Sequence, residues 1–333
     1  MSTKGSSLRH DAWTRLRKNS MATTSLFFVI FVIGSCFLVP FFGQLSAPDD
    51  SSLNETENQT LQYQEHWFKP PNYQNLENKF TAPSAQHLLG TDQVGRDLLS
   101  RLLYGGQISI LVGLVSTTIA CMIGIPYGAI SGYIGGRTDN TMMRIVDILY
   151  GLPFLVIVIL ISVIFYAYTK EVTEFLINTW KWDSEFVIKY ANLTPLFIAI
   201  GIIGWLTIAR ITRAQTLSVK KLEYIEAARS LGLPHSTIML RHILPNTLGP
   251  IIVYATLTVP GFILTEASLS YLGLGVQSPN SSWGILLQEG SNYMETQPRL
   301  LIVPSVLFSL TLLALNFLGD GLRDALDPKA AKD

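Results

Sequence analysis

The sequence predicts an all-α membrane protein with six transmembrane helices, on the basis of its composition and the positions of its charges. Of the 333 residues, 48% are hydrophobic and only 14% are charged, whereas a soluble protein carries about 25% charged residues. Long windows contain no Asp, Glu, Lys or Arg. A helix needs about 20 apolar residues to cross the hydrocarbon core of a bilayer. Six windows meet this requirement, at residues 22–43, 107–131, 148–169, 190–209, 247–265 and 300–319.

The distribution of Lys and Arg predicts which side of the membrane each loop occupies. Six spans place both termini on one side, and if that side is the cytoplasm, 16 of the 24 Lys and Arg residues are cytoplasmic. Cytoplasmic loops of membrane proteins carry an excess of these residues. We therefore expect both termini, and the polar loop between the fourth and fifth spans, in the cytoplasm. The net charge of zero hides this asymmetry and does not indicate a nucleic-acid partner.

The first 106 residues divide into three predicted parts. Residues 1–21 are polar and basic and form a cytoplasmic segment. Residues 22–43 are a longer apolar run than the core of a cleaved signal peptide, so we expect an uncleaved first transmembrane helix. Residues 44–106 are expected to be extracytoplasmic and to end in an interfacial helix. Thr91 or Asp92 can cap that helix, whose apolar face carries Leu98, Leu99, Leu102 and Leu103.

Residues 107–319 are predicted to be the core domain with five transmembrane helices, followed by a cytoplasmic tail at residues 320–333. The loop between the third and fourth spans, residues 170–189, is expected to lie outside the membrane and is assigned no role. Glu266 lies at the outer end of the fifth span. Because ionisable groups near the membrane often line a transport pathway, Glu266 is a candidate pathway residue. The alternatives are an interfacial position or a pair with a neighbouring residue.

The polar loop between the fourth and fifth spans, residues 220–246, has helical character. Residues 220–231 are predicted to form one helix, and Gly232 then supplies the left-handed conformation that commonly ends a helix. Pro234 is typical of the first turn of a second helix, which is expected to stop near Pro245. This compact helix–turn–helix could move as a rigid body. The alternative is a helix pair that packs under the bundle and docks nothing.

Residues 226–245, EAARSLGLPHSTIMLRHILP, resemble the coupling loop of importer permeases of the ATP-binding-cassette (ABC) class. His242 departs from the aliphatic residue of the general pattern but matches the variant found in the peptide-transporter branch. The blocks at 266–284 and 318–328 resemble the peptide and nickel permeases more specifically. The resemblance extends from about residue 87 to residue 328, and it implies the type I permease fold of ABC importers.

The resemblance also implies a site and a set of partners. The loop would sit in a groove on an ATP-hydrolysing subunit. The residues implied in this contact are Glu226, Ala227, Ala228, Gly232, Leu244 and Pro245. The implied partners are a second, homologous permease, two ATPase subunits that hold ATP and Mg, an extracytoplasmic substrate-binding protein and membrane lipid. The expected location is the inner membrane of a bacterium, and the expected substrate is an oligopeptide or dipeptide.

The sequence contains no motif that would make this chain an enzyme. It lacks the G-x-x-x-x-G-K-[ST] phosphate loop, an H-E-x-x-H pair and a G-x-S-x-G turn. We therefore expect a transporter subunit with no cofactor or metal of its own. Nickel, glutathione or another small solute are alternative substrates. Alternatives of another class are a membrane scaffold, or a secondary carrier or channel, which would require internal repeats and a coupling-ion site.

Overall fold

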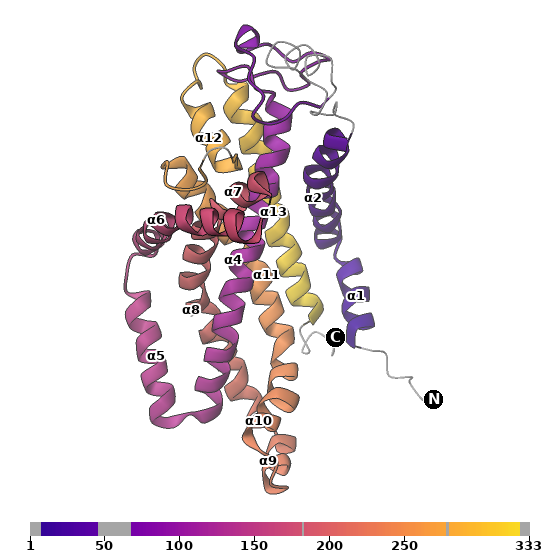
Figure 1. The fold of residues 1–333 in the computed structure, drawn as a ribbon. Coiled ribbons are helices and arrows are strands. Elements are labelled where there is room, and N and C mark those ends of the chain that lie inside the picture. Colours follow the sequence, from indigo (N-terminus) through magenta and orange to yellow (C-terminus); the bar gives the residue numbers. More distant parts are fainter. Residues whose placement is uncertain (1–7, 46–67, 182, 278–279, 327–333) are drawn as a thin grey trace.

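The structure, a computed structural model, describes residues 8–45, 68–181, 183–277 and 280–326. Within these ranges it confirms an all-α bundle with six helices long and apolar enough to cross a membrane (Figure 1). The six are α2 (Ser20–Leu45), α4 (Leu98–Ile134), α6 (Phe154–Trp180), α8 (Thr194–Val219), α11 (Leu244–Tyr271) and α13 (Arg299–Leu326). The other helical elements are α1 (Leu8–Lys18), η2 (Leu76–Asn78), α5 (Gly136–Tyr150), α7 (Ser184–Ala191), α9 (Glu223–Ser230), α10 (His235–Thr237), η3 (Ile238–Ile243) and α12 (Trp283–Ser291).

Helices α4 and α8 form the centre of the bundle, and small residues bring their backbones together. Gly124, Gly128 and Gly132 recur every four residues on α4 and face α8. A Cβ atom at Gly128 would lie 2.2 Å from the carbonyl oxygen of Ala209, so this approach tolerates no side chain. Membrane helices commonly associate through such rows of small residues, because packing rather than the hydrophobic effect must hold them together in lipid.

A second core joins α4 to α11, α12 and α13. Trp283, the first residue of α12, is completely buried. Its indole Nε1 donates to the carbonyl oxygen of Leu102 at 3.0 Å, and its ring packs edge-on against Phe308. At the opposite end of the molecule, α1 packs on the end of α13 through Leu16 and Ala325. Both of these segments lie towards the same end of the bundle as α9 (Figure 1).

The third span differs from its predicted boundaries of 148–169. Residues 148–150 belong to α5, and the chain turns at Gly151 before α6 begins after Pro153. Proline has no amide hydrogen and Pro153 has an extended backbone, so it separates the two helices. Helix α6 continues to Trp180, and α7 follows, so most of the predicted 170–189 loop is helical. In Figure 1, α6 crosses α8 at a steep angle instead of running along it.

The expected cap at Thr91 or Asp92 is wrong. Asp97 is the N-cap of α4, and its side chain accepts a hydrogen bond from the backbone N–H of Ser100 at 2.9 Å. Thr91 instead forms an isolated β-bridge with Asp97. Residues 98–106 are therefore the first turns of the same helix that forms the second span, and they are not a separate interfacial helix.

The sequence predicted that the second helix of the polar loop stops near Pro245, and this prediction is wrong. Helical structure runs without a break from His235 to Tyr271. The residues just before Pro245 form a π-helical turn, in which the N–H of Leu244 donates to the carbonyl oxygen of Met239. A proline in a helix lacks one donor and clashes with the preceding turn. The wider π turn accommodates it, which is a common use of such segments.

Candidate functional site

The predicted coupling loop forms a folded protrusion at one end of the bundle (Figure 1), which we call the elbow (residues 220–246). Its first helix, α9, ends in a glycine cap. Gly232 has a φ of +75°, its N–H donates to Arg229 at 2.9 Å, and the N–H of Leu233 donates to Ala228 at 3.2 Å. This pair of bonds is the Schellman motif, which favours glycine at the left-handed position. The predicted turn at Gly232 is therefore present.

The elbow has its own apolar core. Ile225, Ile238 and Ile243 are completely buried and come from α9 and η3. They pack against Tyr133 at the end of α4 and Val219 at the end of α8. Burying an Ile side chain contributes about 1.5–3 kcal/mol, so these three residues favour the packing of α9 against η3. The elbow is thus a packed unit that is attached to both central helices.

Polar contacts reinforce this attachment around Tyr133. The Tyr133 hydroxyl lies 2.7 Å from Nδ1 of His235, and the Lys220 amine donates to the Tyr133 carbonyl oxygen. The guanidinium of Arg229 lies 5.5 Å from the centre of the Tyr133 ring, within range of a cation–π interaction. Burial, and secondarily the charge of Arg229, lower the pKa of Lys220. The last turn of α4 therefore contacts the elbow on both sides of the turn at Gly232, through Lys220 and Arg229 before it and His235 after it.

The outer face of the elbow is exposed and partly apolar. Leu231 is 81% exposed and Leu240 is 64% exposed, and Leu233 and Tyr224 are also exposed. Glu226 lies on the same short helix as Tyr224. Exposed apolar side chains on a polar protrusion, away from the apolar spans, are typical of a surface that binds another protein.

The six predicted contact residues differ in their exposure. Glu226, Ala227, Gly232 and Pro245 are exposed, Leu244 is half-buried, and Ala228 is 5% exposed. Ala228 packs inside the elbow core, so its position does not fit the implied close approach to a partner. Its small size is explained instead by packing between α9 and η3. The contact of the other residues with an ATPase stays a prediction.

At the other end of α4, a buried ion network joins this helix to α12. The guanidinium of Arg101 is 2.9 Å from Oδ2 of Asp92, and it also binds both carboxylate oxygens of Glu289. Arg96 adds a 2.6 Å bond to Asp92 and a 3.1 Å bond to Glu289. The side chains of Arg101 and Asp92 are only 3% and 2% exposed. The network therefore fixes α12 against the start of α4.

The pKa of Glu289 predicts how the stability of this network depends on pH. Burial alone would raise that pKa, but the bonds and charges of Arg101 and Arg96 outweigh it and hold the pKa below the ordinary value of 4.5. The stabilisation is therefore present above pH 4.5 and is lost as the pH falls through the depressed pKa. We expect the melting temperature of the purified protein to fall more steeply below pH 4.5 than that of Glu289→Gln. An equal dependence of melting temperature on pH in the two proteins would contradict this linkage.

Glu266, a residue of α11, is completely buried against α4 and α12. Its carboxylate accepts hydrogen bonds from Ser109 at 2.8 Å and Ser270 at 2.7 Å. Ser109 also accepts from the backbone N–H of Trp283 at 3.2 Å, and Ser282 caps α12. The sequence allows three roles for Glu266: a pathway residue, an interfacial residue and a partner of a neighbouring residue. The hydrogen bonds to Ser109 and Ser270 match the third. A pathway role would require α12 to move away from the carboxyl group, and it stays a prediction.

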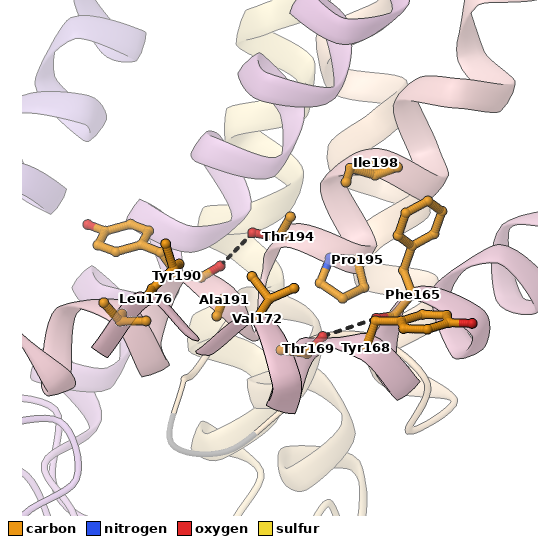
Figure 2. Close-up of a pocket in the computed structure, with 11 residues that line it drawn as sticks. Phe165, Tyr168, Thr169, Val172, Leu176, Tyr190, Ala191, Thr194, Pro195 and Ile198 are labelled. Atoms are coloured by element: carbon orange, nitrogen blue, oxygen red, sulfur yellow. Dashed lines mark hydrogen bonds between the residues drawn. The ribbon is translucent and has the colours of Figure 1, made fainter. Parts of the chain in front are cut away.

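An apolar pocket of about 400 Å³ lies between α6, α7 and α8. Figure 2 shows Phe165 and Tyr168 of α6 opposite Pro195 and Ile198 of α8, with Tyr190 at one side. None of its lining residues is charged. Its polar groups are the hydroxyls of Tyr168, Thr169, Tyr190 and Thr194, so the surface of the pocket is mainly apolar.

Sequence reasoning missed the network of Asp92, Arg101 and Glu289, because its members are separated by up to 197 positions. The available signal was weak: Arg101 lies between the apolar pairs Leu98–Leu99 and Leu102–Leu103 in a helix that leads into a span. A charge at such a position needs a partner, but the sequence does not say which one. Among the described residues, no group of three or more His, Cys, Asp or Glu side chains is arranged to hold a metal ion.

Six spans with a folded, exposed elbow at one end define a membrane subunit of a transporter. The chain belongs to the family of binding-protein-dependent transport system inner membrane components, whose model matches residues 124–332. The model for the N-terminal transmembrane domain of oligopeptide transport permease C matches residues 7–83. The chain is therefore a multi-pass inner-membrane permease of the ABC importer class, and it is a transporter component, not an enzyme.

Curated relatives cover nearly the whole chain. The sequence is 43% identical to the oligopeptide transport system permease protein of Haemophilus influenzae, over 99% of this chain and 91% of that protein. It is 38% identical to the dipeptide transport system permease protein of Bacillus subtilis, over 97% and 86%. It is 36% identical to a glutathione transport system permease protein of Escherichia coli, over 96% and 90%. These matches confirm the resemblance inferred from the elbow sequence.

Proposed function

We propose that this chain is one of two membrane subunits of an importer for oligopeptides or dipeptides, driven by two separate ATPase subunits that bind ATP and Mg. The observation that carries the proposal is the elbow, a rigid unit whose outer face presents Glu226, Ala227 and Leu231. The similarity to permeases of oligopeptide and dipeptide transport systems supports the substrate. A homologous permease would supply the other wall of the passage, and an extracytoplasmic binding protein would deliver the peptide.

The attachment of the elbow suggests how force would reach the membrane helices. The elbow packs on Tyr133 at the end of α4 and continues directly into α11. Closure of the ATPases on ATP would push the elbow, and a packed unit would pass this displacement to both helices because it cannot absorb it internally. The cavity would then open outward, accept peptide and close again after hydrolysis. This is alternating access with the motor on another chain.

The proposed orientation places the elbow, α1 and the end of α13 in the cytoplasm. The excess of Lys and Arg in these segments supports it. The α4–α12 network, including Arg101 and Glu289, would then lie outside the membrane, where a binding protein could dock. A cysteine introduced at exposed Ser236 should react with a membrane-impermeant maleimide only after the cells are opened. Equal labelling in intact cells would indicate that the elbow lies outside the cytoplasm.

Co-purification, uptake by vesicles and substrate competition test the proposed function. A tagged chain should co-purify with an ATP-binding subunit and a second permease, and vesicles holding the complex should take up trialanine only with ATP and the binding protein. Accumulation by vesicles that hold this chain alone, without nucleotide, would favour a secondary carrier. Competition by di- and oligopeptides, but not by nickel or glutathione, is the expected substrate profile. Stronger competition by nickel or glutathione would replace the peptide assignment.

A further inference from the structure

The segment that precedes α4 lies at the end of the bundle opposite the elbow (Figure 1). Its residues line a polar cavity of about 360 Å³. This volume is near the lower end of the range of about 300–1,000 Å³ that is typical of small-molecule sites. Lys69, His87 and Asn75 line it, and each is at least nine-tenths buried. It differs from the apolar pocket of Figure 2, because most of its lining is polar.

Lys69 is the unusual group in this cavity. It is 4% exposed, and its amine donates to the carbonyl oxygen of Gln86 at 3.3 Å and lies 3.2 Å from Nε2 of His87. No carboxylate of the described residues lies within ion-pair distance of this amine. An ammonium group has three donors, and these two contacts leave one of them for the cavity. Burial lowers the pKa of Lys69, although the more distant Asp97 opposes this effect.

The neighbours of Lys69 hold its amine in a fixed position. Nδ1 of His87 lies 2.9 Å from Oδ1 of Asp97, and a carboxylate can only accept, so Nδ1 carries the hydrogen. The other ring nitrogen, Nε2, lies 3.2 Å from the Lys69 amine, so the imidazole stands between this amine and the Asp97 carboxylate. Asp97 is also the cap of α4. His87 and Asp97 therefore connect the Lys69 amine to the first turn of α4.

A buried ammonium without a contacting carboxylate is incomplete, because burial removes water from the charge and only part of that loss is replaced. A carboxylate that enters the cavity would complete it with a charge-assisted hydrogen bond. Glu77 lines the same cavity and is exposed, so a negative group is also available for a ligand cation. The two charges suit a molecule that has both an ammonium and a carboxylate group.

We propose that this cavity binds a small zwitterion of the amino-acid or short-peptide class, with the ligand carboxylate paired to Lys69 and the ligand ammonium directed towards Glu77. This inference rests on the proposed peptide transport and adds a binding site on this chain, outside its membrane spans. Because Asp97 both binds His87 and caps α4, the site is attached to the helix whose other end contacts the elbow.

The binding test uses the purified transport complex in nanodiscs without its binding protein, and trialanine as the probe. Trialanine affinity should fall at least about tenfold in Lys69→Met, because one charge-assisted pair is lost. Lys79→Met is the matched control, since Lys79 is exposed on the same segment, and it should bind as the wild type does. Trialanine amide, which has no carboxylate, should bind equally weakly to the wild type and to Lys69→Met. Equal trialanine affinities in all three proteins would overturn the proposal.

A second measurement needs no variant and therefore holds even if Lys69→Met does not fold. Reductive methylation of the wild-type complex, read by mass spectrometry, gives the reaction rate of each lysine amine. Trialanine, but not its amide, should slow the reaction at Lys69 and leave Lys79 unchanged. An unchanged rate at Lys69 would overturn the site, while normal ATP-driven peptide uptake in the same preparation would leave the proposed transport function intact.

Discussion

Replacing Ala227 by Trp is expected to abolish ATP-driven uptake while the chain still folds and inserts. Ala227 is exposed on α9, next to Glu226, on the face that we propose to contact an ATPase. A Trp side chain there meets no part of the elbow core but would hold the partner away. Loss of docking should lower uptake at least about tenfold, which corresponds to roughly 1.4 kcal/mol of binding free energy. Uptake in vesicles and co-purification of the ATPase measure the effect.

The neighbouring alanine provides the contrast that makes this experiment decisive. Ala228 is 5% exposed and packs against the core of Ile225 and Ile238. Trp at this position should unfold the elbow, and limited proteolysis should then cut it. Ala227→Trp should leave the elbow resistant to protease, and Ala227→Ser should behave as the wild type does. Normal uptake and normal ATPase binding in Ala227→Trp would exclude the outer face of α9 as the docking surface.

The same pair of alanines shows where sequence reasoning succeeds and where it stops. The residue pattern placed a turn at Gly232 because a left-handed cap is a local requirement, and the structure has this cap. The pattern did not separate Ala227 from Ala228, since small residues suit both a close docking contact and a tight interior. Only the packing of η3 against α9 decides between them. Local residue preferences thus predicted the turn of the elbow, whereas tertiary contacts determine which of its residues are buried and which are exposed.

The spans follow a similar rule. Long windows without charge predicted six membrane helices, because the cost of an ion in lipid is large and easily seen in a sequence. Their ends were less predictable. Pro153 separates two helices, whereas Pro245 lies within continuous helical structure behind a π turn. Proline thus ends helical structure at one position and is accommodated at the other. The difference depends on whether the preceding backbone can change its hydrogen bonding.

The candidate site outside the membrane was the least predictable part. Lys69, His87 and Asp97 are unremarkable in the sequence, and their relation appears only when the segment before α4 folds back on itself. Arg101 and Glu289 are 188 residues apart. Each charge implies that a partner exists, but many carboxylates could serve. Sequence patterns therefore predict the need for such pairs, while the fold determines which residues form them.

The other large effect is expected for Arg101→Ala, which should destabilise the folded protein by about 3–5 kcal/mol, the usual cost of removing one member of a buried ion pair. The Arg101 guanidinium is 3% exposed and binds both Asp92 and Glu289. Its loss would leave Glu289 with Arg96 and Gln93 as partners. The melting temperature of the purified complex and its resistance to denaturant measure the loss.

Arg210→Ala is the matched control for this prediction. Arg210 also pairs with a carboxylate, at 2.7 Å from Asp147, but the two side chains are 42% and 59% exposed. Water screens such a pair, so its removal should cost only about 0–1 kcal/mol. Arg210 also lies 4.1 Å from the centre of the Tyr150 ring, so the comparison sets a buried network of two carboxylates against an exposed pair with a cation–π contact. Equal losses of stability in the two variants would show that the Arg101 network does not hold α12 against α4.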